Sequence, residues 1–327
     1  MRVSIRQLAD YCGVSIGTID RVLNNRPGVK KQTKERIEKA IDELGYTPNH
    51  LAKSLSLGKT SSIGVVLFNL NNLFFAQLSD AIVKEADARG YFAYLTLSEK
   101  SKEKEFACIK NLVARQVDGI ILFSTNRDLE FTAYLSSCGV KVVTVMTGLT
   151  GFPSVRIDDY SAMADATSYI ASKQYKRIVY ISPPLSYRKD MNILVQEQRY
   201  EGFLHTVKKW SLEPIVIDHV HYLEAIDHLH VGDVKTAFLC SSDVYALDIL
   251  RHFRLKGFVP PYHYGLMGFD NISILQNIEP SIATVSIPIE DVGREAIAML
   301  VRAIEGEGEV METLTLPYTI FPGQTIV

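Results

Sequence analysis

The chain has 327 residues, of which 47% are hydrophobic and 22% charged, and its formal net charge is −2. This length exceeds what one compact hydrophobic core ordinarily serves, so two or three domains are expected. The amino-terminal residues lack the apolar run of a signal peptide, and no stretch of about eighteen apolar residues occurs, which argues against export and against a membrane span. Four cysteines without a CxxC pair are expected to be reduced and buried, and a cytoplasmic protein is predicted.

Charge is unevenly distributed along the chain. Residues 1–60 hold 11 Lys and Arg against 6 Asp and Glu, a net charge of +5, whereas the other 267 residues hold 24 against 31, a net charge of −7. Basic charge gathered in one short segment of an acidic chain is typical of a domain that binds a polyanion.

Residues 4–24 are predicted to form two short helices around a tight turn. Ser4 can cap the first helix and Gln7 completes a Ser-x-x-Gln capping box, while Gly13 ends that helix and Ser15 can cap the second. The apolar residues of the first helix, at the i, i+3, i+4, i+7 spacing of one helical face, are Ile5, Leu8, Ala9 and Cys12.

The second helix combines an apolar inner face with small or polar outer positions. Ile19, Val22 and Leu23 form the inner face. In a helix-turn-helix unit the second helix enters the major groove of DNA with its first residues against the base edges. The residues that we expect at the DNA from this helix and its cap are Ser15, Ile16, Gly17, Thr18, Asp20, Arg21 and Asn24.

A third helix is predicted from about Thr33 to Leu44, with Gly45 as its carboxyl-terminal stop. The segment 49–55 that follows Pro48 could form less than two turns of helix, which would be marginal in isolation. Residues 58–62 have the composition of a flexible linker.

From Ile63 onward, apolar strands alternate with helices. The expected strands lie at 63–68, 92–97, 119–123, 140–146, 177–182, 214–217, 236–239 and 264–269. Continuous apolar strands separated by helices indicate parallel sheets covered on both faces, and about 265 residues suit two doubly wound α/β lobes. Such sheets bind ligands at the carboxyl ends of their strands, so a cleft between the lobes is the expected site.

Over nearly its whole length the chain resembles the lac repressor (LacI) family of bacterial transcription regulators. In the first part the resemblance rests on residues 5–15, 18–24, 43–49 and 52–55, and in the second on 72–75, 117–120, 199–203, 242–246 and 268–270. It implies a periplasmic-binding-protein-like core of two lobes and a homodimer that binds a pseudo-palindromic operator in double-stranded DNA. It also implies control by a small effector, commonly a sugar.

The resemblance implies that the segment after Pro48 is a hinge helix that folds on DNA and wedges a leucine, here Leu55, into the minor groove. Unstacking one base step in this way costs a few kcal/mol, which contacts to the bent duplex recover. The alternative is that Leu51 and Leu55 are ordinary hydrophobic residues of a linker. If Leu55 is the wedge, Leu55→Ala should weaken operator binding but not effector binding. The segment adds Asn49, His50, Ala52, Lys53 and Leu55 to the predicted DNA contacts.

The second helix departs from the family at two positions. Gly17 stands where a longer polar residue is common and offers no side chain to a base, and Asp20 stands where serine is common. A carboxylate at Asp20 can accept a hydrogen bond from cytosine N4, or can instead pair with a basic neighbour such as Arg21. Arg21 is the best candidate for a bidentate contact to guanine.

A sugar site needs apolar faces for the ring and polar groups for the hydroxyls. Such groups occur after the expected strands, and the predicted effector-binding residues are Asn72, Phe74, Phe75, Arg199, Asp243 and Asp270. Arg199 can offer a planar set of donors to neighbouring oxygens. The competing roles are core packing for one of the two phenylalanines and helix capping for Asp243.

The strand that ends at residues 145–148 lacks the charged pair that many relatives carry there, so the cleft should be less polar on that side. A deoxy or modified sugar, or another small polar ligand, would fit as well.

No catalytic constellation is found, and no cofactor or metal site is predicted. Gly13-Val14-Ser15-Ile16-Gly17 matches a nucleophile-elbow pattern but follows a helix instead of a strand, and the histidine pairs 219/221 and 228/230 have no further metal ligands nearby. We therefore predict a repressor with three parts, residues 1–46, 47–61 and 62–327. A solute-binding receptor and an α/β enzyme are the alternatives.

Overall fold

The computed structural model describes residues 3–46, 59–231, 233–307 and 313–327. The chain divides into two compact units, Met1–Thr60 and Ser61–Val327. The predicted hinge segment, with Asn49, His50, Ala52, Lys53 and Leu55, lies outside the described residues.

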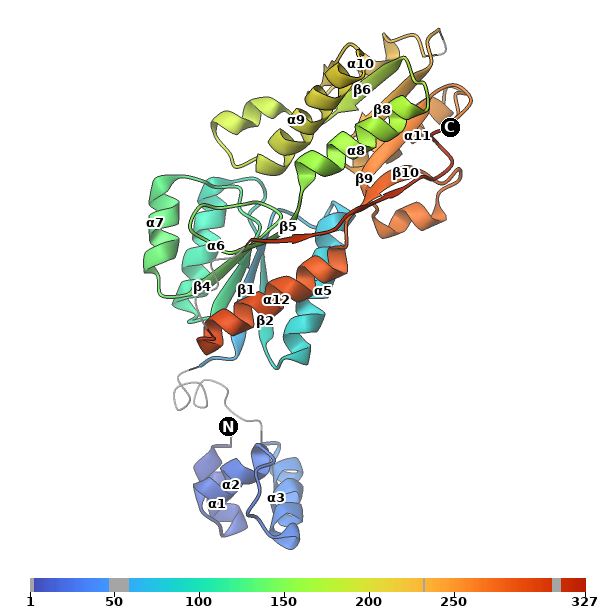
Figure 1. Cartoon of the computed structure of the whole chain (residues 1–327). Helices are drawn as coiled ribbons and strands as arrows, with labels where there is room; N and C mark the ends of the chain where they lie inside the picture. Colours follow the sequence, from blue (N-terminus) through green and yellow to red (C-terminus); the bar gives the residue numbers. More distant parts are fainter. Residues whose placement is uncertain (1–2, 47–58, 232, 308–312) are drawn as a thin grey trace. The chain divides into compact units, whose positions relative to one another are not determined.

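The first unit contains the helices α1 (Ile5–Cys12), α2 (Ile16–Leu23) and α3 (Lys31–Leu44) (Figure 1). Both bonds of the predicted capping box are present, because the Ser4 hydroxyl accepts from Gln7 N and the Gln7 side chain accepts from Ser4 N. Gly13 takes a left-handed conformation with φ 62°, which permits the tight turn into α2. Leu8, Ile19 and Ile37 are completely buried where the three helices meet.

The second unit contains two six-stranded sheets. The first has the order β11-β5-β4-β3-β1-β2, and all of its pairings are parallel. Its strands are β1 (Ser62–Leu67), β2 (Phe92–Leu97), β3 (Gly119–Leu122), β4 (Lys141–Val145), β5 (Ser154–Ile157) and β11 (Thr313–Leu316).

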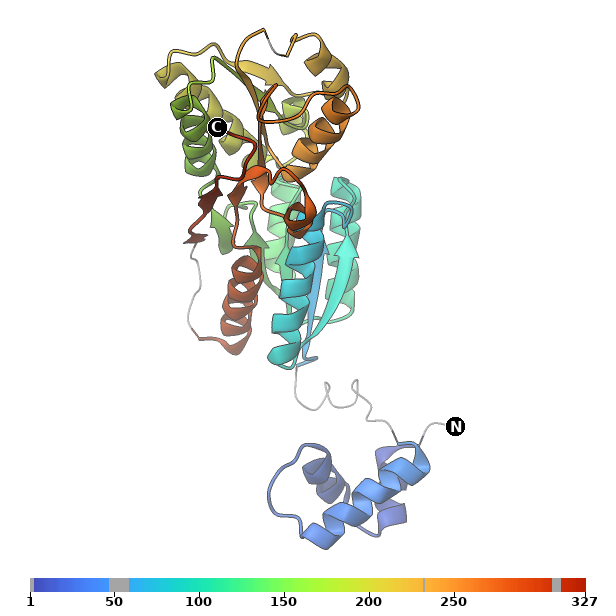
Figure 2. The same cartoon turned by 90° about the vertical axis from the view of Figure 1, so that its right-hand side faces the viewer.

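Helices cover both faces of this sheet. One face packs against α5 (Leu73–Ala88) and α12 (Ile289–Glu305), and the other against α6 (Lys102–Ala114) and α7 (Leu129–Ser137) (Figure 2). Strand residues alternate between the two covers, as Val65 packs with the first pair and Val66 with the second. This sheet and its four helices form the first lobe.

The second sheet has the order β12-β10-β9-β8-β6-β7 and is parallel except for the β10–β12 pairing. Its strands are β6 (Arg177–Ile181), β7 (Ile215–Ile217), β8 (Thr236–Cys240), β9 (Gly265–Asp270), β10 (Ala283–Ser286) and β12 (Thr319–Phe321). Its helices are α8 (Asp159–Ser172), α9 (Leu194–Lys209), α10 (Tyr222–Asp227) and α11 (Asp243–Arg254), with short 3₁₀ turns at Leu185–Lys189 and Ser273–Asn277. This sheet and these helices form the second lobe.

The chain passes between the lobes three times, from β5 to α8, from β10 to α12 and from β11 to β12. The predicted fold class, a helical head followed by two doubly wound α/β lobes, is confirmed. β5, β10, β11 and β12 were not among the expected strands. None of the described helices has the length and apolar composition needed to cross a membrane.

Candidate functional site

In the first unit, α2 presents a polar face to solvent. Ile19 and Val22 are buried against the other helices, whereas Gly17 and Arg21 are exposed and Ile16 keeps 42% of its surface accessible. The Ser15 hydroxyl caps the helix by accepting from Thr18 N at 3.2 Å. The start of α2, the end that a helix-turn-helix presents to base edges, is therefore accessible.

The Asp20 side chain is held by contacts to two nearby side chains of the same unit. Its carboxylate accepts from Asn24 Nδ2 at 2.8 Å and pairs with Arg26 Nη1 at 3.3 Å. The basic partner is thus Arg26 instead of the suggested Arg21, whose guanidinium forms no ion pair with any described residue. This arrangement favours the pairing alternative for Asp20 and leaves Arg21 available to a nucleic-acid base.

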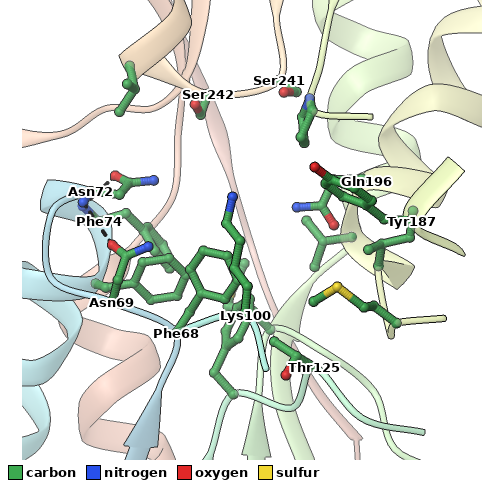
Figure 3. Close-up of a pocket in the computed structure, with 18 of the residues that line it drawn as sticks. Phe68, Asn69, Asn72, Phe74, Lys100, Thr125, Tyr187, Gln196, Ser241 and Ser242 are labelled. Carbon is green, nitrogen blue, oxygen red and sulfur yellow. Dashed lines mark hydrogen bonds between the residues drawn. The ribbon is translucent and has the colours of Figure 1, made fainter. Parts of the chain in front are cut away.

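In the second unit, a cavity of about 400 Å³ lies between the two lobes at the carboxyl ends of their strands (Figure 3). The first lobe contributes Phe68, Asn69, Asn71, Asn72, Phe74, Phe75, Lys100, Phe123, Thr125 and Met146. The second lobe contributes Pro183, Pro184, Tyr187, Met191, Asn192, Ile193, Val195, Gln196, Arg199, Ser241, Ser242, Val244, Tyr245 and Asp270.

Phenylalanine rings form one wall of this cavity. The Phe75 ring centroid lies 5.6 Å from that of Phe68 and 4.8 Å from that of Phe123, and Phe74 packs edge-on against Phe75 at 5.3 Å. Phe74 and Phe75 are both buried in the core and both line the cavity. Asn72 caps α5 by accepting from Phe74 N at 3.0 Å, which places this turn at the cavity edge.

Opposite charges meet on the second lobe around Arg199. Its Nε donates to Asp159 at 2.7 Å, its Nη1 donates to the Ser241 carbonyl and lies 3.5 Å from the Asp270 carboxylate, and its guanidinium stacks 3.6 Å from the Phe269 ring centroid. Burial raises the pKa of Asp159 and that of Asp270 above the ordinary value, although the charge of Arg199 opposes both shifts. The network fixes the guanidinium plane at the cavity surface.

Asp270 also carries backbone strain, because its φ of 113° is one that residues with a side chain rarely adopt. Strain of this kind is commonly kept where it positions a group for a ligand.

The expectation for Asp243 needs correction. The residue begins α11, but it is completely buried, and its carboxylate accepts from Ile272 N at 2.9 Å and from the Thr284 hydroxyl at 2.7 Å. It does not line the cavity, and Ser242 precedes the helix as its cap. Asp243 therefore ties α11 to the strand ends behind the cavity instead of facing the cavity itself.

Hydrogen bonds join the lobes beside the cavity. From the second lobe, Asn192 N donates to the Thr125 carbonyl at 2.9 Å and Asn192 Nδ2 donates to the Gly148 carbonyl at 3.2 Å. The loop that holds Thr125 is fixed in turn by the buried carboxylate of Glu105, which accepts from Thr125 N at 2.7 Å and from the Ser124 hydroxyl at 2.8 Å. Polar contacts therefore hold this loop in place, and Thr125, which the loop contributes to the cavity lining, carries no charge.

Residues 4–49 match the family model for bacterial regulatory proteins of the lacI family, and residues 167–326 match that for a periplasmic binding protein-like domain. The chain therefore joins the DNA-binding domain of lacI-family regulatory proteins to a periplasmic binding protein-like domain. The prediction of a DNA-binding transcription regulator is confirmed by these matches.

Known regulators match this chain from end to end. Catabolite control protein A of Priestia megaterium is 29% identical over 330 residues, with 98% of each chain covered. The structure of the transcriptional regulator CelR with cellobiose is 26% identical with a TM-score of 0.69, covering 99% of this chain and 100% of that one. The lac repressor dimer bound to operator and the anti-inducer ONPF, 21% identical with a TM-score of 0.86 and full coverage of both chains, shows the same fold.

Several cavity residues were missed by the sequence analysis. Phe68, Lys100 and Phe123 each follow a strand of the first lobe within three residues, and a stricter use of the strand-end rule could have found them. Tyr187 and Gln196 come from the segment after β6, where no sequence signal marks a site. Asp159 was missed because nothing in the sequence relates it to Arg199, 40 residues away.

Within the described part of the chain, no group of three or more His, Cys, Asp or Glu side chains could hold a metal ion.

Proposed function

We propose that this protein is a repressor that binds a pseudo-palindromic operator as a homodimer and is controlled by a sugar or sugar derivative in the cavity between its lobes. One observation carries the proposal: a helix-turn-helix unit and a ligand-sized cavity between two lobes occur in the same chain. We regard it as a regulator and not an enzyme because its family consists of regulators, and we place its action in the cytoplasm, where its DNA target lies.

At the operator, α2 enters the major groove. Arg21 donates to guanine O6 and N7, and the exposed Ile16 side chain contacts a thymine methyl group, since Gly17 offers only backbone. Asp20, held by Asn24 and Arg26, shapes this face without contacting a base. The net charge of +5 on residues 1–60 supplies the attraction to phosphates, which makes affinity fall steeply with salt.

In the cavity, the phenylalanine wall stacks against the apolar face of a sugar ring, and Arg199 and Asp270 bind its hydroxyl groups. A volume of about 400 Å³ lies within the usual range for small-molecule sites. The relative CelR has been solved with cellobiose, which supports a sugar as the ligand class.

Control follows from the construction of the two lobes. The residues that line the cavity come from both lobes, so an effector binds most tightly to one arrangement of them. It changes operator affinity only to the extent that it binds the two arrangements differently.

The test is selection of bound sequences from a random duplex pool by the full-length protein, repeated with each of a panel of sugars. Recovery of a pseudo-palindrome supports the proposal, and its loss or gain with one sugar identifies the effector and the direction of control. Failure to enrich any sequence, with a sugar still bound, would favour a solute-binding receptor instead.

A further inference from the structure

Among the described residues that line the cavity, Lys100 is a cation without an ion-pair partner. The charged residues among its described lining are Lys100, Arg199 and Asp270. Figure 3 shows the Lys100 ammonium group projecting into the middle of the cavity, above the phenylalanine wall. Its Nζ lies 5.1 Å from the centroid of the Phe68 ring.

The two cations differ in what already binds them. Two carboxylates and a carbonyl surround Arg199, which is only 5% exposed. No described carboxylate lies within ion-pair distance of Lys100, and the adjacent Glu99 pairs with Lys104. Lys100 therefore keeps its three N–H donors for a ligand.

The turn that carries Lys100 is built at a conformational cost. Glu99 and Lys100 both adopt left-handed conformations, with φ of 50° and 63°, and neither is a glycine. The turn is fixed on both sides, because Glu99 N donates to the Phe68 carbonyl at 2.9 Å and Ser101 caps α6 by accepting from Lys104 N at 3.1 Å. The chain passes directly from β2 into α6 through this turn, and it places the lysine at the cavity.

We propose that the effector carries an anionic group, a carboxylate or a phosphate, which binds the Lys100 ammonium group while the ring of the effector stacks on the phenylalanine wall. This inference rests on the proposed function, since it specifies the ligand class of the same cavity. A charge-assisted hydrogen bond in a cavity with mostly apolar walls is stronger than a neutral one. A neutral sugar offers the ammonium group only hydroxyl oxygens, which accept a weaker hydrogen bond than an anionic oxygen does.

The experiment measures the thermal stabilisation of the full-length protein by small-molecule metabolites separated into anionic, neutral and cationic fractions. Titrations follow with sets that match a neutral sugar to its acid and its phosphate, such as glucose, gluconate and glucose 6-phosphate. The corresponding sugar, acid and phosphate of a pentose form a second set. We expect the anionic fraction to stabilise the protein and one anionic member to bind about tenfold or more tightly than its neutral counterpart. The sugar-acid and phosphate arms distinguish the two anion sources.

The Lys100→Met variant is expected to lose this preference for the anion, and Lys100→Arg to keep most of it. Lys110→Met is the matched control, because Lys110 also lies over a phenylalanine ring, that of Phe106 at 4.1 Å, but does not line the cavity. It should bind the anionic ligand as the unaltered protein does.

The outcomes separate this inference from the proposed function. Stabilisation by the neutral or cationic fraction alone, or an anion preference that persists in Lys100→Met, would overturn the anionic effector and leave effector control intact. Stabilisation by no fraction would overturn effector control itself, and the anionic effector with it.

Discussion

Two buried carboxylates, Asp243 and Asp270, lie at or behind the cavity, and their raised pKa values lead to a prediction about pH. Asp243 is completely buried, and burial raises its pKa to about 7 although hydrogen bonds from Thr284 and Ile272 oppose the shift. Burial raises the pKa of the nearby Asp270 in the same direction. The folded state therefore holds protons at these carboxylates that the unfolded chain, with an ordinary Asp pKa near 3.8, releases at lower pH.

The pH dependence of stability should change in Asp243→Asn. The stabilisation from a raised pKa is fully present below about pH 4 and is lost as the pH rises through about 7. We expect the free energy of unfolding to fall less across this interval in Asp243→Asn than in the unaltered protein, because the amide does not ionise. Urea unfolding between pH 4.5 and 7.5 measures this, with the exposed Asp80→Asn as control. Equal pH dependence in all three proteins would contradict the prediction.

Arg21 should determine base preference at one operator position. Because its guanidinium is exposed on α2 and forms no ion pair with a described residue, Arg21→Ala should remove about 1–3 kcal/mol of discrimination for guanine. Affinities for the selected operator and its single-base variants test this. Lys39→Ala, which alters an exposed lysine of α3, should leave the base preference unchanged. Uniform weakening across all variants by Arg21→Ala would instead identify a phosphate contact.

Among the elements, α8 and α9 show how closely two helices can pack when one position lacks a side chain. A Cβ atom at Gly202 would lie 2.3 Å from the Tyr160 carbonyl oxygen and 3.2 Å from Ala164 N, both of them backbone atoms of α8. Rigid backbone on the facing helix cannot yield to it as a flexible side chain could.

Gly202→Ala should accordingly destabilise the second lobe. We expect a loss of about 1–3 kcal/mol from overpacking, which exceeds the gain of roughly 0.5–1 kcal/mol from replacing a helical glycine. Glu201→Ala, at the exposed neighbouring position of α9, should change stability by no more than about 0.5 kcal/mol. Urea unfolding of the full-length variants provides the measurement, and unchanged or raised stability in Gly202→Ala would contradict the prediction.

Local signals explain which elements could be predicted from sequence. α1 and α2 were predicted because their caps, Ser4 and Ser15, and the glycine between them are close neighbours in sequence. β5 and β11 were not, because neither has a continuous apolar run, and β11 depends on its pairing with β5, Ser154 opposite Thr313. Strand pairing over that sequence separation leaves no local pattern.

The same distinction applies to the candidate site. Asn72, Phe74 and Phe75 directly follow a recognisable strand, and all three line the cavity. Asp243 also follows a strand, but its burial depends on Ile272 and Thr284, which approach it only in the folded lobe. The ion pair of Arg199 with Asp159 likewise depends on the packing of α9 against α8.

At the scale of the whole molecule, the division after Thr60 predicts two separable activities. A protein lacking residues 1–60 should lose operator binding and keep its effector affinity within about twofold, since all cavity residues lie in the second unit. Operator titration and calorimetry with the effector on the same preparation test both parts. Retained operator binding by the shortened protein would contradict the assignment of DNA binding to the first unit.

The three passages between the lobes also constrain how the protein is made. The first lobe takes α12 and β11 from after residue 288, although its other elements end at Ile157. α12 covers an apolar face of the first sheet. The ribosome must synthesise most of the second lobe before α12 exists to bury that face. During that interval the first lobe lacks one of the helices that cover this face, and incompletely buried apolar surface of this kind is prone to aggregation.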